Sequence, residues 1–164
     1  MKEQANLLRL IIGEAEQNIV SDQVWVLETN LDDISGEIVG HCTAKLFEAG
    51  ALDVYTTSIQ MKKNRPGVLL SVLCGPDLVP KMERIIFKET GTLGIRRWPA
   101  SRHKLERRPH SVETAWGKIE GKLAVLSDGS LSFSPEFESC RKIAAEQNLP
   151  LKDVYEGAMR AFVP

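Results

Sequence analysis

The sequence predicts an α+β fold, a ferredoxin-like βαββαβ sandwich with a C-terminal β-hairpin and a two-helix extension. Two amphipathic helical patterns, at 35–49 and 78–86, alternate with runs of β-forming residues in the order strand, helix, strand, strand, helix, strand. This order is the split βαβ pattern. The two middle strands flank a cationic, turn-rich stretch at 60–67. Right-handed crossovers would place both helices on one face of a four-stranded antiparallel sheet.

The first strand and helix follow from local patterns. Residues 24–31 are rich in β-formers and predict a strand. Apolar residues then recur at helical spacing, so 35–49 is predicted to be an amphipathic helix. Gly50 should end this helix in a left-handed conformation. Three side chains are candidate N-caps: Asp32, Asp33 and Ser35.

The second half of the unit repeats the pattern. Strands are predicted at 51–62 and 68–74, and the nearly continuous apolar run of the latter indicates burial on both faces. A turn at 75–77 leads into the second helix, which tolerates Pro80 in its first turn. Residues 92–98 are the predicted fourth strand.

The predicted extension begins with strands at 105–116 and 119–127, joined at Gly117. Asp128-Gly129 is a hairpin signal leading into 131–133. Ser134 is then a predicted N-cap and Pro135 the first helical residue. The apolar stripe of this helix is Phe137, Cys140 and Ala144. Pro150 begins a last helix with its own stripe, Leu151, Val154, Tyr155, Ala158 and Phe162.

Length and composition fit one domain with an appendage. The chain has 164 residues, of which 43% are hydrophobic and 26% charged. We expect residues 1–22 to be a linker or the remnant of a preceding domain, 23–100 the ferredoxin-like unit, and 101–164 the extension. A net charge of −1 favours neither nucleic acid nor membrane. Three cysteines without a CxxC pair fit a reducing compartment, so a cytoplasmic location is expected.

Two basic clusters are candidate anion sites. Lys62, Lys63 and Arg65 are predicted at the hairpin tip, where they could bind a phosphate or simply form a solvated turn. The second cluster is the densest positive run of the chain, an anion pocket or a basic edge that blocks strand pairing. It comprises Arg96, Arg97, Arg102, His103, Lys104, Arg107 and Arg108, opposed only by Glu106. Between the clusters, Thr90 and Thr92 could bind a phosphate or ribose.

Other polar residues have plainer interpretations. Asp32, Asp33 and Glu37 could hold a divalent ion, but helix capping is favoured. Cys42 lies in the apolar stripe of its helix and His41 on the polar face, so a shared metal ion is not expected. No defensible Ser/His/Asp or Cys/His arrangement is present, so no catalytic or metal-binding residue is assigned. An RNA-binding sheet would need aromatic residues that 68–74 lacks.

Four strings together resemble one family: ETNLDDISGE at 28–37, MKKNRPG at 61–67, ETGTLGIR at 89–96 and SPEFESC at 134–140. The resemblance is to the carboxy-terminal part of LarC, the nickel insertion protein that matures the nickel-pincer cofactor of lactate racemase. It covers roughly residues 23–162.

The resemblance implies a CTP-dependent nickel cyclometallase of the lyase or chelatase class. Such an enzyme inserts nickel into a pyridinium bis-thiocarboxylate mononucleotide, using CTP with manganese or magnesium. The family protein has a larger amino-terminal half, of which this chain would hold only the last residues, and the nickel ligands would lie largely there. CTP would bind in the half present here.

The sequence-based hypothesis is therefore a CTP-binding and assembly domain that works with the amino-terminal half. We expect it to form a homo-oligomer and to bind neither nucleic acid nor membrane. The expected phosphate-binding residues are Lys62, Lys63, Arg65, Thr90, Thr92, Arg96 and Arg107. The alternative is a non-catalytic regulatory or oligomerisation module of ferredoxin-like type, because a fold alone does not determine function.

Overall fold

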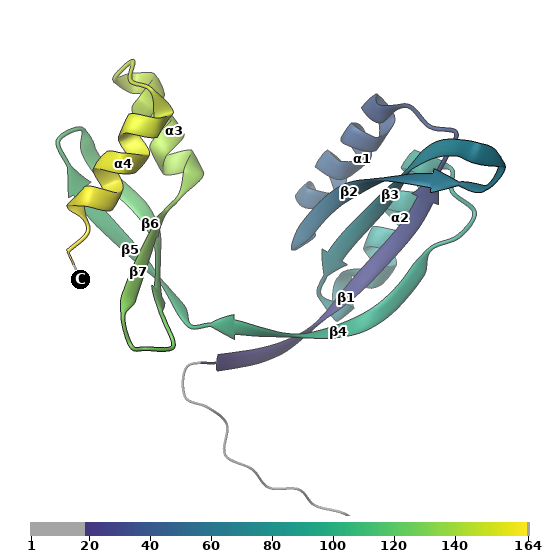
Figure 1. The fold of residues 1–164 in the computed structure, drawn as a ribbon, viewed down its shortest axis with the longest axis horizontal. Helices are drawn as coiled ribbons and strands as arrows, with labels where there is room; N and C mark the ends of the chain where they lie inside the picture. Colours follow the sequence, from purple (N-terminus) through teal and green to yellow (C-terminus); the bar gives the residue numbers. More distant parts are fainter. Residues whose placement is uncertain (1–18, 164) are drawn as a thin grey trace, which may run out of the picture. The chain divides into compact units, whose positions relative to one another are not determined.

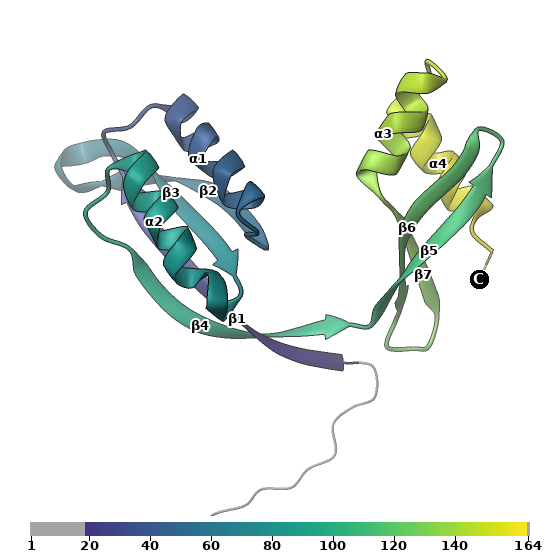
Figure 2. The ribbon, with the colours of Figure 1, turned by 180° about the vertical axis from the view of Figure 1, so that it is seen from behind.

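The computed structural model describes residues 19–163. These residues divide into two compact units, Ser21–His103 and 104–163, and each is considered by itself. In each unit two helices lie on one face of an antiparallel sheet, as Figure 1 and the reverse view in Figure 2 show. The expected remnant at 1–22 lies almost entirely outside the described residues.

The first unit contains six main elements: β1 (Ile19–Leu31), α1 (Gly36–Glu48), β2 (Asp53–Met61), β3 (Arg65–Cys74), α2 (Val79–Thr90) and β4 (Arg96–Leu105). Its sheet has the order β2-β3-β1-β4, and β3 is antiparallel to both β1 and β2. This is the arrangement of a ferredoxin-like fold, so the predicted class is confirmed.

Alternation along β1 divides the sheet into two faces. Leu27, Thr29 and Leu31 are buried beneath the helices. Glu28 and Asn30 therefore point to the opposite face, where no helix of this unit lies. The core between sheet and helices includes Leu27, Leu31, Val39, Cys42, Leu46, Leu70, Val72, Cys74, Met82 and Ile86.

Three predictions about this unit were wrong in detail. β4 begins at Arg96 rather than Thr92, because Thr92 and Gly94 are hydrogen-bonded to the side chain of Thr29. β3 begins at Arg65, so Pro66 lies in the strand; it is tolerated because the pairing of β1 with β3 reaches only Val68. Burial along β3 is also incomplete on the face without helices.

The second unit contains β5 (Arg107–Thr114), β6 (Gly117–Val125), β7 (Leu131–Pro135), α3 (Phe137–Glu146) and α4 (Leu151–Ala161). Its sheet has the order β5-β6-β7, with antiparallel pairing throughout. Both helices pack on a second core that includes Val112, Ile119, Leu123, Phe133, Cys140, Ile143, Val154 and Ala158. The predicted hairpin and two-helix extension is thus confirmed.

The start of α3 differs from the prediction. Pro135 is still in β7, paired with Gly121, and the N-cap residue is Glu136. The Glu136 N–H donates to Glu120 O at 2.8 Å, which keeps the chain extended beyond Ser134. Because the helix starts later, Phe137 lies at its first turn and is half exposed rather than in the core.

We predict that Leu46→Ala lowers the free energy of unfolding by about 2–5 kcal/mol, because Leu46 is fully buried and the truncation leaves a cavity. Ile38→Ala is the matched control, since Ile38 is on the same helix but 44% exposed. Urea denaturation measures both. Equal losses in the two variants would contradict the assigned core face of α1.

Candidate functional site

The hairpin tip is a short 3₁₀ turn, Lys62–Asn64, between β2 and β3. Lys63 and Asn64 both have left-handed backbones, with φ of 59°. Gln60 Nε2 donates to Asn64 Oδ1 at 3.1 Å and braces the turn. Lys62 and Lys63 are exposed and make no ion pair with any residue that the structure describes. The predicted cationic tip is therefore present, with both lysines available to a ligand.

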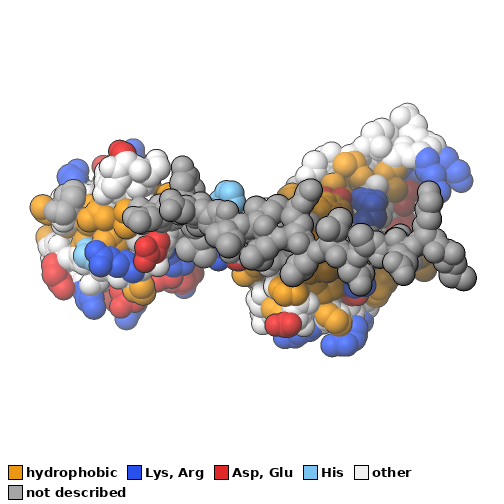
Figure 3. Space-filling view, turned by 90° about the horizontal axis from the view of Figure 1, so that it is seen from below, with side chains coloured by type: hydrophobic (Ala, Val, Ile, Leu, Met, Phe, Trp, Pro, Cys, Tyr) orange, Lys and Arg blue, Asp and Glu red, His pale blue; other side chains and the backbone are white. Residues whose placement is uncertain are grey.

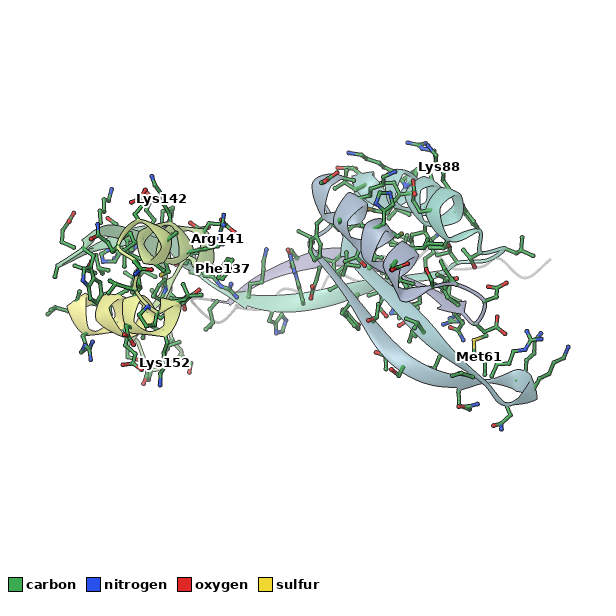
Figure 4. All side chains as sticks on the ribbon, turned by 90° about the horizontal axis from the view of Figure 1, so that it is seen from above. Met61, Lys88, Phe137, Arg141, Lys142 and Lys152 are labelled. Carbon is green, nitrogen blue, oxygen red and sulfur yellow. The ribbon has the colours of Figure 1, made fainter. Side chains whose placement is uncertain are left out.

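Arg65 extends the tip toward β1. Its Nη1 donates to Asp32 Oδ2 at 3.2 Å, across the end of the sheet. Gly67 allows β3 to lie close to the end of β1 and to Met61, since a Cβ added at Gly67 would be only 2.8 Å from Leu31 O and 2.9 Å from Met61 Sδ. Figure 4 labels Met61 at this end of the hairpin, where nitrogen-bearing side chains project from the ribbon.

Arg96 contacts the same strand from the other side. Its Nη2 donates to Asn30 Oδ1 at 2.7 Å and to Glu28 Oε2 at 3.3 Å. Asn30 is the next-to-last residue of β1, and Asp32 directly follows the end of the strand at Leu31. Arg65 and Arg96, from the two predicted clusters, thus both contact residues at the C-terminal end of β1.

The rest of the basic run is distributed over different surfaces. Arg97 turns to the helix face, where it donates to Glu83 Oε1 at 2.9 Å and lies 5.6 Å from the Trp25 ring centroid. Arg102 forms a two-pronged pair with Asp22, at 2.8 and 3.0 Å. β4, the strand that carries Arg96, Arg97 and Arg102, lies at the edge of its sheet. Arg107 and Arg108 belong to the other unit.

The charges of the molecule are mixed. On the face visible in Figure 3, Lys and Arg side chains lie beside Asp and Glu side chains rather than in one large cationic area. Arg65, Arg96, Arg97 and Arg102 each have an acidic partner. Such pairs fix the position of a guanidinium but add little stability when exposed.

The predicted threonines are built into the loop before β4. Thr90 Oγ1 donates to Ile86 O at 2.7 Å, and the Thr92 hydroxyl lies 2.7 Å from that of Thr29. Thr29 in turn donates to Gly94 O at 2.9 Å. The hydroxyls therefore fix the loop, which presents Leu93 fully exposed. The sequence analysis missed Thr29, whose position within a strand of β-formers gave no sign of this role.

A second feature that the sequence analysis missed is a polar clamp between α1 and α2. Lys45 Nζ donates to Glu89 Oε1 at 2.7 Å, and His41 Nε2 lies 3.5 Å from Glu89 Oε2. The hydrogen bond from Lys45 is the main cause that lowers the pKa of Glu89. The clamp holds the last turn of α2, from which the 91–95 loop continues.

The cysteines are core residues, as predicted. Cys42, Cys74 and Cys140 are fully buried and free. Burial raises the pKa of Cys42 to about 11 and also raises the pKa values of Cys74 and Cys140. The three thiols are therefore protonated at neutral pH, which makes them poor metal ligands in this state.

The cap at the start of α1 is Ser35 rather than Asp32 or Asp33. Ser35, one of the three candidate caps, is the N-cap residue of α1 and accepts from the Ile38 N–H.

Within residues 19–163, no group of three or more His, Cys, Asp or Glu side chains is arranged to hold a metal ion. In the same part of the chain, no helix is long and apolar enough to cross a membrane.

Comparison with known proteins supplies the family. The family model described as nickel insertion protein matches residues 1–155. The chain belongs to the nickel insertion protein family. The chain is 46% identical over 159 residues to the pyridinium-3,5-bisthiocarboxylic acid mononucleotide nickel insertion protein of Acetivibrio thermocellus, covering 96% of this chain and 39% of that protein. It is 43% identical over 161 residues to a putative nickel insertion protein of Gloeothece citriformis, covering 96% and 40%.

Solved structures agree with this membership. The apo form of LarC2, the C-terminal domain of a cyclometallase involved in synthesis of the NPN cofactor of lactate racemase, matches with a TM-score of 0.80 and 35% identity. The match covers 87% of this chain and 98% of that domain. Protein MK0293 of Methanopyrus kandleri matches with a TM-score of 0.61 and 29% identity, covering 85% and 88%. The resemblance stated from the sequence is thus confirmed, and the chain spans about two fifths of the nickel insertion proteins it matches.

We predict that Thr29→Val loosens the loop before β4. The variant keeps the side-chain shape but removes the hydroxyl that bonds to Thr92 and Gly94, at a cost of about 1–2 kcal/mol. Hydrogen exchange should accelerate in residues 91–95. Thr57→Val, at an exposed strand position, is the matched control. Unchanged exchange in Thr29→Val would show that these hydrogen bonds do not hold the loop.

Acid should weaken the clamp between α1 and α2. Because the folded-state pKa of Glu89 is lowered, its stabilisation is present above the unfolded value of about 4.3 and is lost as pH falls through the folded value. Glu89→Gln should therefore lose less stability than the wild type on acidification below about pH 4.3. Denaturation midpoints across this range measure the difference. Glu48→Gln is the control, and parallel curves for wild type and Glu89→Gln would refute the assignment.

Proposed function

We propose that this chain is the CTP-binding and assembly part of a nickel insertase, which puts nickel into a pyridinium bis-thiocarboxylate mononucleotide to mature the nickel-pincer cofactor of lactate racemase. The nickel-insertion part of the proposal is supported by relatives named for nickel insertion into this mononucleotide and for synthesis of the cofactor of lactate racemase. The observation that carries the proposal is the approach of Arg65 and Arg96 to the C-terminal end of β1, beside Lys62 and Lys63, which have no ion-pair partner among the described residues.

These four cations suit a nucleoside triphosphate. The lysines are mobile point charges without internal partners, while the arginines are held in position by Asp32, Asn30 and Glu28. A triphosphate would bind along the tip and exchange part of these internal contacts for stronger charge-assisted bonds to phosphate. The divalent ion carried with CTP, manganese or magnesium, would offset the repulsion between the phosphates and Asp32 or Glu28.

In the proposed site, Thr90 and Thr92 would mainly fix the position of the backbone before Arg96. Their hydroxyls are engaged by Ile86 and Thr29, so they hold the backbone immediately before Arg96. The threonines therefore contribute to the proposed site by placing Arg96 over β1. Arg107, the remaining predicted residue, lies in the other unit and is considered below.

The nickel chemistry itself would need more than this chain. Nickel is the inserted metal and thus a substrate, and the protein's three thiols are buried and protonated. We therefore propose that the amino-terminal half of the insertase supplies soft ligands and that the two parts act together, with this part forming homo-oligomers. Free buried cysteines also fit a cytoplasmic location.

Calorimetric titration of CTP with manganese into the folded chain tests CTP binding. We predict saturable binding that Lys62→Ala/Lys63→Ala weakens about tenfold or more, since two charge-assisted contacts are lost. Lys88→Ala is the matched control: Lys88 is an exposed lysine of α2 in the same unit (Figure 4). Absence of binding by the wild type would refute the proposed function, and equal affinities of the double variant and the control would refute the assigned site.

A further inference from the structure

The unit of residues 104–163 carries a groove on the sheet face opposite α3 and α4. Ser111 of β5 pairs with Glu120 of β6, and Pro109 pairs with Lys122. By alternation these four side chains point away from the face on which Val112 is buried. They line a groove of about 570 Å³, together with Lys118 and Glu136.

The depth of the groove has a simple cause. Ser111, a short side chain, lies across from Glu120 and between the longer Lys118 and Lys122 of the neighbouring strand. The three β6 residues are exposed and follow one another on one face in steps of about 7 Å. Long side chains around a short one leave a hollow with charged walls.

One end of the groove is purely cationic. A smaller hollow of about 220 Å³ adjoins it at Pro109 and Lys122, and its other lining residues are Arg107 and Arg108. None of these three cations makes an ion pair or hydrogen bond with another described residue. Arg65 and Arg96 are internally paired, so this end differs from the arginines near the hairpin tip. By the same alternation Arg107 points to the face of Lys122, whereas Arg108 pairs with the buried Leu123 and its side chain points to the helix face. The Arg107 guanidinium and the Lys122 ammonium group at this end suit a phosphate.

The middle of the groove has the opposite charge. Glu120 and Glu136 line it next to each other, joined by the bond from the Glu136 N–H to Glu120 O at 2.8 Å. Neither carboxylate is paired with a cation among the described residues. Beyond them lies Lys118. Along the groove the charge therefore runs from cationic to anionic within about 7 Å, and then to a single lysine.

We propose that this groove binds a mononucleotide with a cationic ring. Its phosphate would lie between Arg107 and Lys122, its ribose over Ser111, and its ring beside Glu120 and Glu136, with an acidic ring substituent facing Lys118. A pyridinium carboxylate mononucleotide has this order of charges. The assignment rests on the proposed function, because a pyridinium mononucleotide is named for a relative of the chain. In this assignment the nickel-accepting substrate binds to the second unit, and CTP binds at the hairpin tip of the first unit.

The test is a titration of the whole, isotope-labelled chain with nicotinic acid mononucleotide, followed by NMR. We expect saturable shifts of the Ser111, Glu120 and Lys122 amides, and no comparable shifts at 62–67. Lys122→Glu should weaken binding about tenfold or more, since it replaces a phosphate contact by a repulsive charge. Lys152→Glu is the matched control: Lys152 projects from α4 of the same unit (Figure 4) and does not line the groove. Nicotinic acid riboside, which lacks the phosphate, should bind far more weakly than the mononucleotide.

Three results would overturn the inference: no saturable shift at about 5 mM mononucleotide, shifts centred on 62–67, or equal affinities of Lys122→Glu and Lys152→Glu. A parallel titration with CTP and manganese separates this inference from the proposed function. Mononucleotide binding in the groove without any CTP binding would support the inference and refute the CTP assignment. CTP binding at the tip with an unresponsive groove would do the reverse.

Discussion

The alternation of side chains along β1 is the constraint on which the first unit depends. Thr29 points inward and holds the loop that leads into β4, while Asn30 points outward and holds Arg96. Asp32, directly after the end of the strand, holds Arg65. Residues of β1 thus contribute to the buried core, fix the path of the chain before β4, and help to position the cations. A shift of β1 by one residue would exchange its faces and lose all three together.

Cationic side chains with an acidic partner and those without one differ in how they can bind an anionic ligand. An arginine held by a carboxylate is oriented before a ligand arrives, but the ligand must compete for it. Lys62, Lys63 and the cations around Lys122 have no such partner among the described residues, so they can bind an anion without breaking an internal pair. The two proposed anion sites, one in each unit, match the two phosphate-bearing substrates of the proposed reaction.

Much of the fold could be predicted from periodicity, but the site could be predicted only in part. Helical spacing located α1 and the buried Cys42, apolar runs located Cys74 and Cys140, and the turn formers located the cationic tip. The link from Thr29 to Thr92 joins residues far apart in the sequence, and nothing local signals it. Arg96 and Arg97 are successive residues of β4, so alternation places their side chains on opposite faces of the sheet. The identity of their acidic partners depends on tertiary packing. The roles of the seven predicted phosphate-binding residues remain predictions.

The central claim is that a triphosphate binds where the hairpin tip meets β1. A crystal structure of this chain with CTP and manganese tests it most directly. The account predicts phosphate density in contact with Lys62 or Lys63 and with at least one of Arg65 and Arg96, the latter turned from its β1 partners toward phosphate. Well-ordered CTP bound elsewhere, with Arg65 still on Asp32 and Arg96 still on Asn30, would contradict it.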